Sequence, residues 1–564
     1  MQKCKEKILL AILPFWDPLI PPMGMSSIKS YLQKYRYHVK TVDANVHEQF
    51  RQIQDKYFNT LKSYIPKSKW GNIYSIGHQV WDNHTMAHFN IRYQEVEYTE
   101  LVKILVERTF FCQIDNHQVN ELALILDEFY VRLERYVLEL LEKEKPGVLG
   151  LSVFRGTLAS SLFAFKLAKE KFPSIMTVMG GGIFVNRLTA GSENLEYLVK
   201  KTPYLDKIIV GEGELLFLKL LEGELSGTQK VYTLADIKME AIDISALDAP
   251  DFSDFDLQHY VYLAAYGSRS CPFQCGFCSE PVYWGKYREK NIKQVIEHMV
   301  GLSETYGSRV FLMTDSLLNP FITDLATEFS ALEPNIYWDG FLRADQKSCS
   351  ADIVLLWRRG GFYRARMGLE SGSQRILELM DKRITPGLIK QSVSNLAYAG
   401  IKTTTFWMVG YPGETEEDFL QTLALIEELK DDIYEADCNP FMYFHTGQVN
   451  ADQWMMSAKV SPLYPEKSRG ALMVQSWVME GEPSREETYR RVYRFMEHLD
   501  RLSIPNPYTL QEIYKADERW KQLHKNAVPS LLELRSPDTC IGESQKVTRV
   551  ISASNTLQDD GDWF

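Results

Sequence analysis

Three cysteines lie close together in the stretch Ser270-Cys271-Pro272-Phe273-Gln274-Cys275-Gly276-Phe277-Cys278-Ser279. Thiolates in this Cys-x-x-x-Cys-x-x-Cys spacing can hold three corners of a cubane four-iron–four-sulfur cluster. No fourth cysteine lies nearby in the sequence, so one iron is left open for a small molecule. A structural zinc site takes four ligands, and disulfides use cysteines in pairs. The spacing therefore predicts an iron–sulfur cluster with Cys271, Cys275 and Cys278 as its ligands.

This loop resembles the cluster loop of the radical S-adenosylmethionine (radical SAM) superfamily, in which an aromatic residue such as Phe277 precedes the last cysteine. The resemblance implies that the open iron binds the amino and carboxylate groups of S-adenosylmethionine (AdoMet). One electron then releases a 5′-deoxyadenosyl radical. An electron donor such as flavodoxin or ferredoxin is the partner that this chemistry implies.

The composition is that of an ordinary globular protein, because 45% of the 564 residues are hydrophobic and 24% are charged. The net charge of −11 gives no signal of nucleic-acid binding. The apolar run Ile8–Leu13 ends at Pro14 without a cleavage site, so it predicts a buried strand rather than a signal peptide. No apolar stretch reaches membrane-spanning length. Because the cluster is oxygen-sensitive and the other cysteines are scattered, we expect a cytoplasmic protein; those cysteines are Cys4, Cys112, Cys349, Cys438 and Cys540.

Residues 1–225 are expected to form a doubly wound, Rossmann-like parallel sheet, because short apolar runs alternate with loops and helices. A helix is expected over Ser26–Lys34. The stretch of about 46–145 is too long for a simple connection and has a helical pattern over roughly Glu121–Lys145, so we interpret it as a helical insertion that covers the sheet edge. The expected strands are Lys7–Leu13, Tyr37–Asp43, Val148–Val153, Thr177–Met179 and Lys207–Val210.

Glycine-bearing loops follow several of these strands. They are Pro21-Pro22-Met23-Gly24, Gly180-Gly181-Gly182 and Gly211-Glu212-Gly213-Glu214. Ligands of such sheets bind at the carboxyl ends of the strands, where glycine lets them approach the backbone. In this order, and ahead of the cysteine loop, the segments resemble the cobalamin-binding domain that is fused to many radical SAM enzymes. The resemblance implies that cobalamin contacts Ser152, Gly180, Gly181, Gly182, Gly211, Glu212 and Gly213.

One feature of methionine synthase-like proteins is missing from the sequence. Those proteins carry an Asp-x-His-x-x-Gly motif that places a histidine on cobalt, and His38 and His47 lie in different surroundings. We therefore expect the lower face of the cobalt to lack a protein histidine.

Residues 226–260 are expected to form an acidic linker, and residues 261–444 a partial (βα)6 radical SAM barrel. The cysteine loop follows the first barrel strand, which places it at the carboxyl-terminal mouth where barrel enzymes carry their chemistry. The expected strands are Val261–Tyr266, Val310–Thr314, Ile336–Leu342, Tyr363–Leu369, Thr403–Val409 and Glu435–Phe444.

Polar residues at other strand ends are candidates for holding AdoMet. Arg343 can bind a carboxylate with two hydrogen bonds, and Glu370 can accept from ribose hydroxyls or from the ammonium group. Val409 can flank the adenine. Gly410 opens the segment Gly410-Tyr411-Pro412-Gly413-Glu414-Thr415, which resembles the family's Gly-x-Pro-Gly-Glu-Thr segment beside AdoMet.

Residues 445–564 show no such resemblance. We expect them to be mainly helical, to choose the substrate and to end in a polar tail from Gly542. A helix is expected over Glu486–Leu502, and its arginines, Arg490, Arg491 and Arg494, are expected to form a solvated face.

These features together predict a cobalamin-dependent radical SAM enzyme with an α/β fold. Its expected reaction is methylation of an unactivated carbon in a small-molecule or peptide substrate, with a radical that removes hydrogen and methylcobalamin that supplies the methyl group. The same residues allow two alternatives. One is a cyclase or rearrangase that uses both cofactors without methyl transfer. The other is a radical SAM enzyme whose cobalamin domain is vestigial or regulatory.

Overall fold

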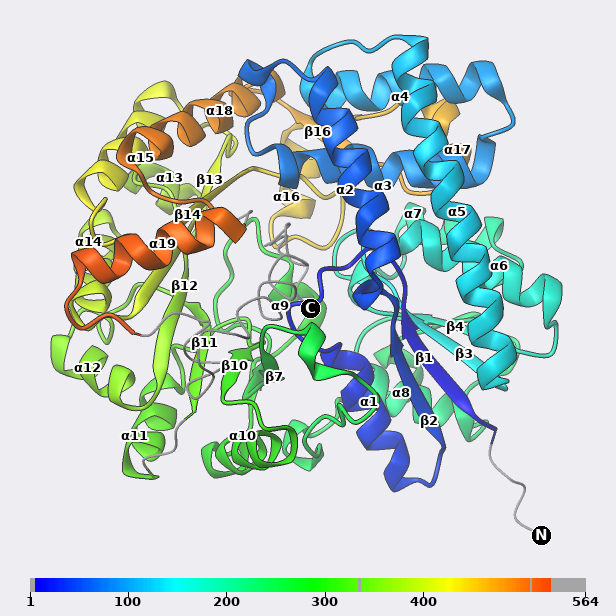
Figure 1. The fold of residues 1–564 in the computed structure, drawn as a ribbon, viewed down its shortest axis with the longest axis horizontal. Helices are drawn as coiled ribbons and strands as arrows, with labels where there is room; N and C mark the ends of the chain where they lie inside the picture. Colours follow the sequence, from blue (N-terminus) through cyan, green and yellow to red (C-terminus); the bar gives the residue numbers. More distant parts are fainter. Residues whose placement is uncertain (1–5, 333–335, 508–509, 529–564) are drawn as a thin grey trace, which may run out of the picture.

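The computed structural model describes residues 6–332, 336–507 and 510–528. Two parallel six-stranded sheets organise this part of the chain, and Figure 1 shows them side by side, each with helices around it. The α/β fold class predicted from the sequence is therefore confirmed. Cys4, Cys540 and the predicted polar tail from Gly542 lie outside the described residues.

The first sheet has the strand order β2-β1-β3-β4-β5-β6. Every residue of its central strand β1 is buried, as the apolar run predicts. Helix α1 begins at Met23, earlier than predicted, because the chain turns into the helix directly after Pro22. The strands are β1 (Ile8–Ile12), β2 (Val39–Asp43), β3 (Val148–Ser152), β4 (Met176–Gly180), β5 (Lys207–Ile209) and β6 (Val231–Tyr232), and the helices are α1 (Met23–Lys34), α6 (Leu158–Lys171), α7 (Glu193–Lys201) and α8 (Gly213–Leu221).

Strand β6 falls in the stretch that was expected to be a linker. It pairs with β5 through only two residues, Val231 and Tyr232, which is too short to leave a periodic signal in the sequence.

The insertion between β2 and β3 consists of four long helices: α2 (Glu48–Tyr64), α3 (Ile73–Ile91), α4 (Glu95–Phe110) and α5 (Asn116–Glu144). Helix α3 also reaches the second sheet, where Ser75 donates a hydrogen bond to Asn439 at 2.7 Å and Asn72 donates one to Asp437 at 3.0 Å. The interpretation of the insertion as a cover for the sheet edge was therefore incomplete, because it also bridges the two sheets.

The second sheet has the strand order β14-β13-β12-β11-β10-β7, so its strands follow the chain in sequence and form an open barrel of parallel strands. Strand β14 ends at Pro440, before the predicted end at Phe444. The strands are β7 (Leu263–Ala265), β10 (Val310–Met313), β11 (Tyr337–Leu342), β12 (Phe362–Glu370), β13 (Lys402–Val409) and β14 (Glu435–Pro440), and the main helices are α10 (Ile292–Tyr306), α11 (Ile322–Leu332), α12 (Ala351–Arg359), α14 (Pro386–Tyr398) and α15 (Glu416–Glu428).

The last region is mainly helical, as predicted, but it also contains an antiparallel pair of strands that the sequence did not reveal. The prediction that the charged face of α18 (Arg485–Leu502) is solvated is wrong at one position. Arg491 is only 4% exposed, and its guanidinium donates to Glu414 at 2.7 Å. The elements are α16 (Ala451–Ser457), β15 (Lys459–Pro462), α17 (Arg469–Leu472), β16 (Trp477–Glu480), α18 (Arg485–Leu502) and α19 (Leu510–Leu523).

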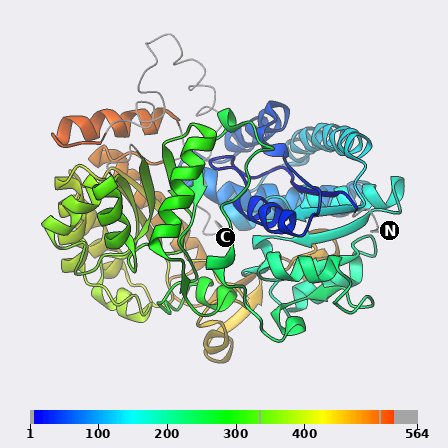
Figure 2. The ribbon, with the colours of Figure 1, turned by 90° about the horizontal axis from the view of Figure 1, so that it is seen from below.

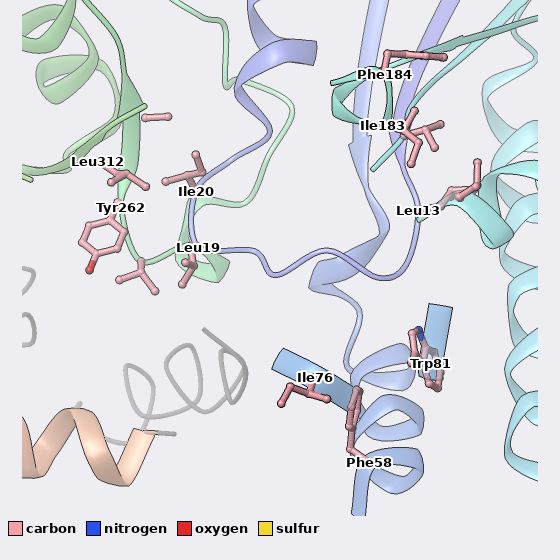
Figure 3. Packing of buried hydrophobic residues seen from close by; sticks show 14 of the residues in the cluster. Leu13, Leu19, Ile20, Phe58, Ile76, Trp81, Ile183, Phe184, Tyr262 and Leu312 are labelled. Carbon is pink, nitrogen blue, oxygen red and sulfur yellow. The ribbon is translucent and has the colours of Figure 1, made fainter. Parts of the chain in front are cut away.

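A continuous apolar core joins the two sheets. The loop after β1 carries Leu19 and Ile20 to the start of the barrel, where Leu19 O accepts hydrogen bonds from the backbone of Val261 at 2.9 Å and Tyr262 at 3.0 Å (Figure 3). Figure 2 shows the two sheets, with the helices around them, side by side when seen from below. Within the described ranges, no helix is long and apolar enough to cross a membrane.

Candidate functional site

The cysteine loop lies between the short strand β8 (Ser268–Arg269) and helix α9 (Glu280–Trp284). Its turn is closed by a hydrogen bond from Cys278 N to Cys275 O at 2.9 Å. Gly276 is held on both sides, because its N–H donates to Met380 O and its carbonyl accepts from Asn450 N. All three cysteines line one cavity of about 420 Å³, here called the cysteine cavity.

The chemistry of this cavity fits a cluster. Burial raises the pKa of the Cys271 and Cys278 thiols, so bound iron would displace protons to obtain thiolates. The described residues contain no group of three ligands close enough for a single metal ion. A cubane cluster does not need one, because each cysteine binds a different iron. The three cysteines can therefore hold a cluster, and their assignment as ligands stays a prediction.

Arg343 lies beside the cysteines at the end of β11. Asn319 fixes its backbone through two hydrogen bonds of 2.8 Å, and its guanidinium lies 4.0 Å from the Phe273 ring. One nitrogen, Nη1, is 3.6 Å from Cys275 Sγ. The other, Nη2, is buried and has no hydrogen-bond partner in the part of the chain that the structure describes. A buried, fixed guanidinium with a free nitrogen is suited to a ligand carboxylate.

Glu370 lies at the end of β12 in a left-handed conformation with φ 64°, next to an irregularity in the pairing with β13. Its Oε1 accepts from Lys382 Nζ at 2.8 Å, and both side chains line the cysteine cavity. Burial acts to lower the pKa of Lys382, but Glu370 and then Cys275 act to raise it, and on balance the pKa is raised. Lys382 was not among the predicted residues. It lies 12 residues after Glu370 in the sequence, and only the fold brings the two side chains together.

The other two predicted AdoMet residues are placed differently. Val409 is fully buried, and its neighbour Met408 lines the cysteine cavity instead. Gly410 has φ 78° and borders an adjoining cavity. A Cβ on Gly410 would lie 2.2 Å from Thr488, so this position requires glycine for packing. The structure therefore brings Arg343 and Glu370 to the cysteines, but it does not bring Val409 or Gly410 to the same wall.

A second cavity of about 230 Å³ lies at the carboxyl ends of the first sheet and is here called the glycine-loop cavity. It is enclosed on its other side by the barrel residues Tyr266, Arg269 and Trp284. Trp16 and Phe154, whose rings stack 4.1 Å apart, also lie on its wall. Its lining includes every residue predicted to contact cobalamin, namely Ser152, Gly180, Gly181, Gly182, Gly211, Glu212 and Gly213.

The lining of this cavity suits a flat apolar ligand that approaches the backbone. Gly181 has φ 109°, and a Cβ there would lie 2.4 Å from Val153 N. Aromatic side chains supply flat apolar walls. The Glu212 side chain, in contrast, is bound in an ion pair with Arg288, so it ties the glycine loop to the barrel. The contacts of these residues with cobalamin remain predictions.

The cavities adjoin one another. Ser316 lines both the cysteine cavity and the glycine-loop cavity, and its hydroxyl donates to Glu280 at 2.6 Å. A third cavity of about 170 Å³, here called the side chamber, also meets the cysteine cavity. The residues that line both are Gln79, Arg155, Asn186, Phe441, Met442 and Phe444.

The model of the Radical SAM superfamily matches residues 266–426. Among curated proteins, the chain is 24% identical over 325 residues to the anaerobic magnesium-protoporphyrin IX monomethyl ester cyclase of Rubrivivax gelatinosus, a match that covers 53% of this chain and 57% of that protein. The chain thus spans little more than half the length of this relative.

Two solved structures share the fold over most of the chain. One is the radical S-adenosylmethionine methyltransferase TsrM from Kitasatospora setae with cobalamin and a [4Fe–4S] cluster bound. It has a TM-score of 0.58 and 12% identity, and the match covers 97% of this chain and 99% of that chain. The other is the cobalamin-dependent S-adenosylmethionine radical enzyme OxsB, with a TM-score of 0.55, 14% identity and coverage of 92% and 71%.

Proposed function

We propose that this chain, which carries a radical SAM domain at residues 266–426, is a cobalamin-dependent enzyme that methylates an unactivated carbon. The observation that carries the proposal is the junction at Ser316, where the cavity lined by the three cysteines meets the cavity lined by the glycine loops. Two cofactors that act in turn on one substrate carbon must have reactive atoms in adjoining spaces. The fold shared with TsrM and OxsB supports the same arrangement.

The roles of the chain's own residues follow from their positions. Cys271, Cys275 and Cys278 would hold the cluster, and Arg343 and Glu370 would hold the charged groups of AdoMet. The glycine loops of the first sheet would hold cobalamin. When bound, the cluster and AdoMet would supply hydrogen abstraction, and cobalamin would supply the methyl group. An external electron donor, such as flavodoxin or ferredoxin, would provide the reducing electrons.

The half-buried apolar side chains around the junction would limit the access of water. Phe341, Phe406 and Met408 line the cysteine cavity on the barrel side, and Trp16 and Trp284 line the glycine-loop cavity. A reactive carbon radical survives only where competing reactants are excluded. The walls are therefore suited to radical chemistry on a bound substrate.

A second candidate function keeps both cofactors but transfers no methyl group. The likeness to a magnesium-protoporphyrin IX monomethyl ester cyclase favours it, because that protein is named for ring formation. The residues that line the cavities serve both reactions, so the products must decide between them.

The test is a product analysis of the anaerobically reconstituted protein with AdoMet, a reductant and substrate. Methylation is expected to give 5′-deoxyadenosine and S-adenosylhomocysteine in about equal amounts above the uncoupled background, since one AdoMet serves each role. 5′-Deoxyadenosine with a product of unchanged methyl count and without S-adenosylhomocysteine would favour the cyclase. A protein that binds no cobalamin would favour a vestigial domain.

A further inference from the structure

The side chamber is lined by three regions that the fold of the two sheets does not require, together with residues between 155 and 194 of the first sheet's loops and helices and residues 410 and 412 of the barrel. Helix α3 of the insertion forms one wall, the chain after β14 forms a second, and the segment from Leu463 to Tyr489 forms a third. The chamber meets the cysteine cavity through shared side chains, among them Gln79 and Phe441. A substrate in this chamber would therefore have direct access to the predicted position of the radical.

Aromatic rings dominate the chamber. His445 and Trp477 stack with ring centroids 4.6 Å apart and an interplanar angle of 18°, which makes a flat wall. Phe441 and Phe444 are half-buried at the junction with the cysteine cavity. Flat aromatic walls favour a ligand with a planar apolar body, because offset and edge-on ring contacts add to the burial of apolar area. Other aromatic residues of the lining are Tyr443, Tyr464 and Tyr489.

Charge in the chamber is uneven. Four carboxylates line the chamber: Glu482 is exposed to solvent, and the other three have cations beside them. Asp82 binds Arg155 at 2.6 Å, Glu193 lies 3.5 Å from Arg469, and Glu480 binds Lys459 at 2.6 Å. These three carboxylates are therefore already neutralised and have little charge to offer a ligand.

Arg485 is different. Its guanidinium lies 4.5 Å from the centre of the Tyr489 ring and donates to the Tyr489 hydroxyl at 2.9 Å and to Gln79 Oε1 at 3.4 Å. Its remaining acceptor is the carbonyl of Arg108, so every acceptor that the structure shows for it is neutral. Within the described ranges, no carboxylate forms an ion pair with Arg485. A guanidinium that aromatic rings hold in place and no anion neutralises is suited to an anionic ligand group.

We propose that the side chamber binds the substrate, and that the substrate is a small aromatic molecule with a carboxylate that Arg485 holds. The inference rests on the proposed function and adds the substrate class to it. Gln79 lines both the side chamber and the cysteine cavity, and it contacts Arg485 and Tyr489. The carboxylate is therefore held near the boundary between these two cavities. The aromatic body then lies against Phe441 and Phe444.

The experiment uses the reconstituted full-length protein and three probes with the same ring system: 1-naphthylacetate, 1-naphthylacetamide and 2-(1-naphthyl)ethylamine. Equilibrium dialysis gives the dissociation constant of each. A charge-assisted contact is worth ~1.5–3 kcal/mol, so the acid is expected to bind about 10- to 100-fold more tightly than the neutral amide. The amine is expected to bind most weakly.

Variants locate the effect. Arg485→Gln is expected to remove the preference for the acid while it leaves amide binding within about threefold, and Arg485→Lys is expected to keep part of the preference because it keeps the charge. Arg494→Gln is the matched control. Arg494 lies on the same helix and pairs with Glu416 outside the chamber. Trp477→Leu is expected to weaken the acid and the amide alike. Circular dichroism checks that each variant is folded.

Equal affinity of the wild-type protein for acid and amide would overturn the proposal. So would an Arg485→Gln variant that keeps the preference, an Arg494→Gln variant that loses it equally, or no binding of the acid at millimolar concentration. Probe binding needs no turnover. A failure of the proposed methyl transfer is seen separately, as missing cobalamin or missing S-adenosylhomocysteine in the same preparations.

Discussion

Lys382 and Glu370 form a buried ion pair whose disruption should be costly. Their nitrogen and oxygen lie 2.8 Å apart, and the side chains are 10% and 11% exposed. Removing one partner of a buried pair leaves the other charge unpaired and typically costs 3–5 kcal/mol. Because both side chains keep some contact with water, Lys382→Met is expected to lower the free energy of unfolding by about 3 kcal/mol. The double variant Glu370→Gln/Lys382→Met should recover most of this loss, since no unpaired charge remains.

The matched control is the neighbouring pair Arg383–Asp381, which has a similar distance of 2.9 Å but is 65% and 48% exposed. Pairs of this kind contribute about 0–1 kcal/mol, so Arg383→Met should change little. Urea titration of the four proteins without cofactors measures the differences. The reasoning is refuted if Lys382→Met costs no more than Arg383→Met, or if the double variant is as unstable as the single one. Equilibrium dialysis on the reconstituted protein then measures AdoMet binding. The Glu370→Gln variant is expected to bind AdoMet about 10- to 100-fold more weakly than the wild type.

Three further predictions follow from the site. Replacing the three loop cysteines together by alanine should abolish reconstituted cluster and AdoMet cleavage, as iron counting and electron paramagnetic resonance would show. Gly180→Ala should weaken cobalamin binding while it leaves the fold intact, because Gly180 is predicted to contact cobalamin and an added Cβ meets only one protein atom, at 4.0 Å; Gly181→Ala, whose Cβ would clash with the Val153 backbone, should instead lower stability, and absorption spectra of the loaded proteins with urea titrations decide. Burial raises the pKa of Asp315 to about 7, so its contribution to stability is present below its unfolded pKa of about 4 and is lost as the pH rises through 7. The stability of wild type relative to Asp315→Asn should therefore fall by about 2–3 kcal/mol from pH 5 to pH 8, and a constant difference in urea titrations would contradict this.

The sequence was most informative for features that residues close together in the chain determine. The apolar runs located the strands of both sheets except β6 within a few residues, because a buried parallel strand must be apolar along its whole length. The glycine loops were also located, and all of their predicted residues lie on one cavity. The prediction from the cysteine spacing needed no tertiary information, because all three predicted ligands lie in a single loop.

What the sequence missed depends on contacts between distant segments. Lys382 reaches Glu370 only because the chain after β12 folds back over the barrel mouth. Gln79 and Tyr489 are far apart in the sequence, yet they meet on the side chamber, and neither helix carries a motif that marks this contact. Arg491 was expected in solvent because a charged helix face is usually solvated. Its burial is compensated by ion pairs with Glu414 at 2.7 Å and Glu487 at 3.3 Å.

The cysteine cavity and the glycine-loop cavity are connected by ion pairs within the chain. Arg269 precedes the cysteine loop and binds Glu214 of the glycine loop, and Arg288 binds Glu212 of the same loop. The side chains of Glu212 and Glu214 are only 5% exposed, so a shift of the two sheets that breaks these pairs without admitting water would leave charges unpaired in a poorly solvated place. These buried pairs therefore oppose movement of the two sheets relative to each other. If the side chamber binds the substrate as proposed, the substrate can reach the cysteine cavity from it without breaking these ion pairs.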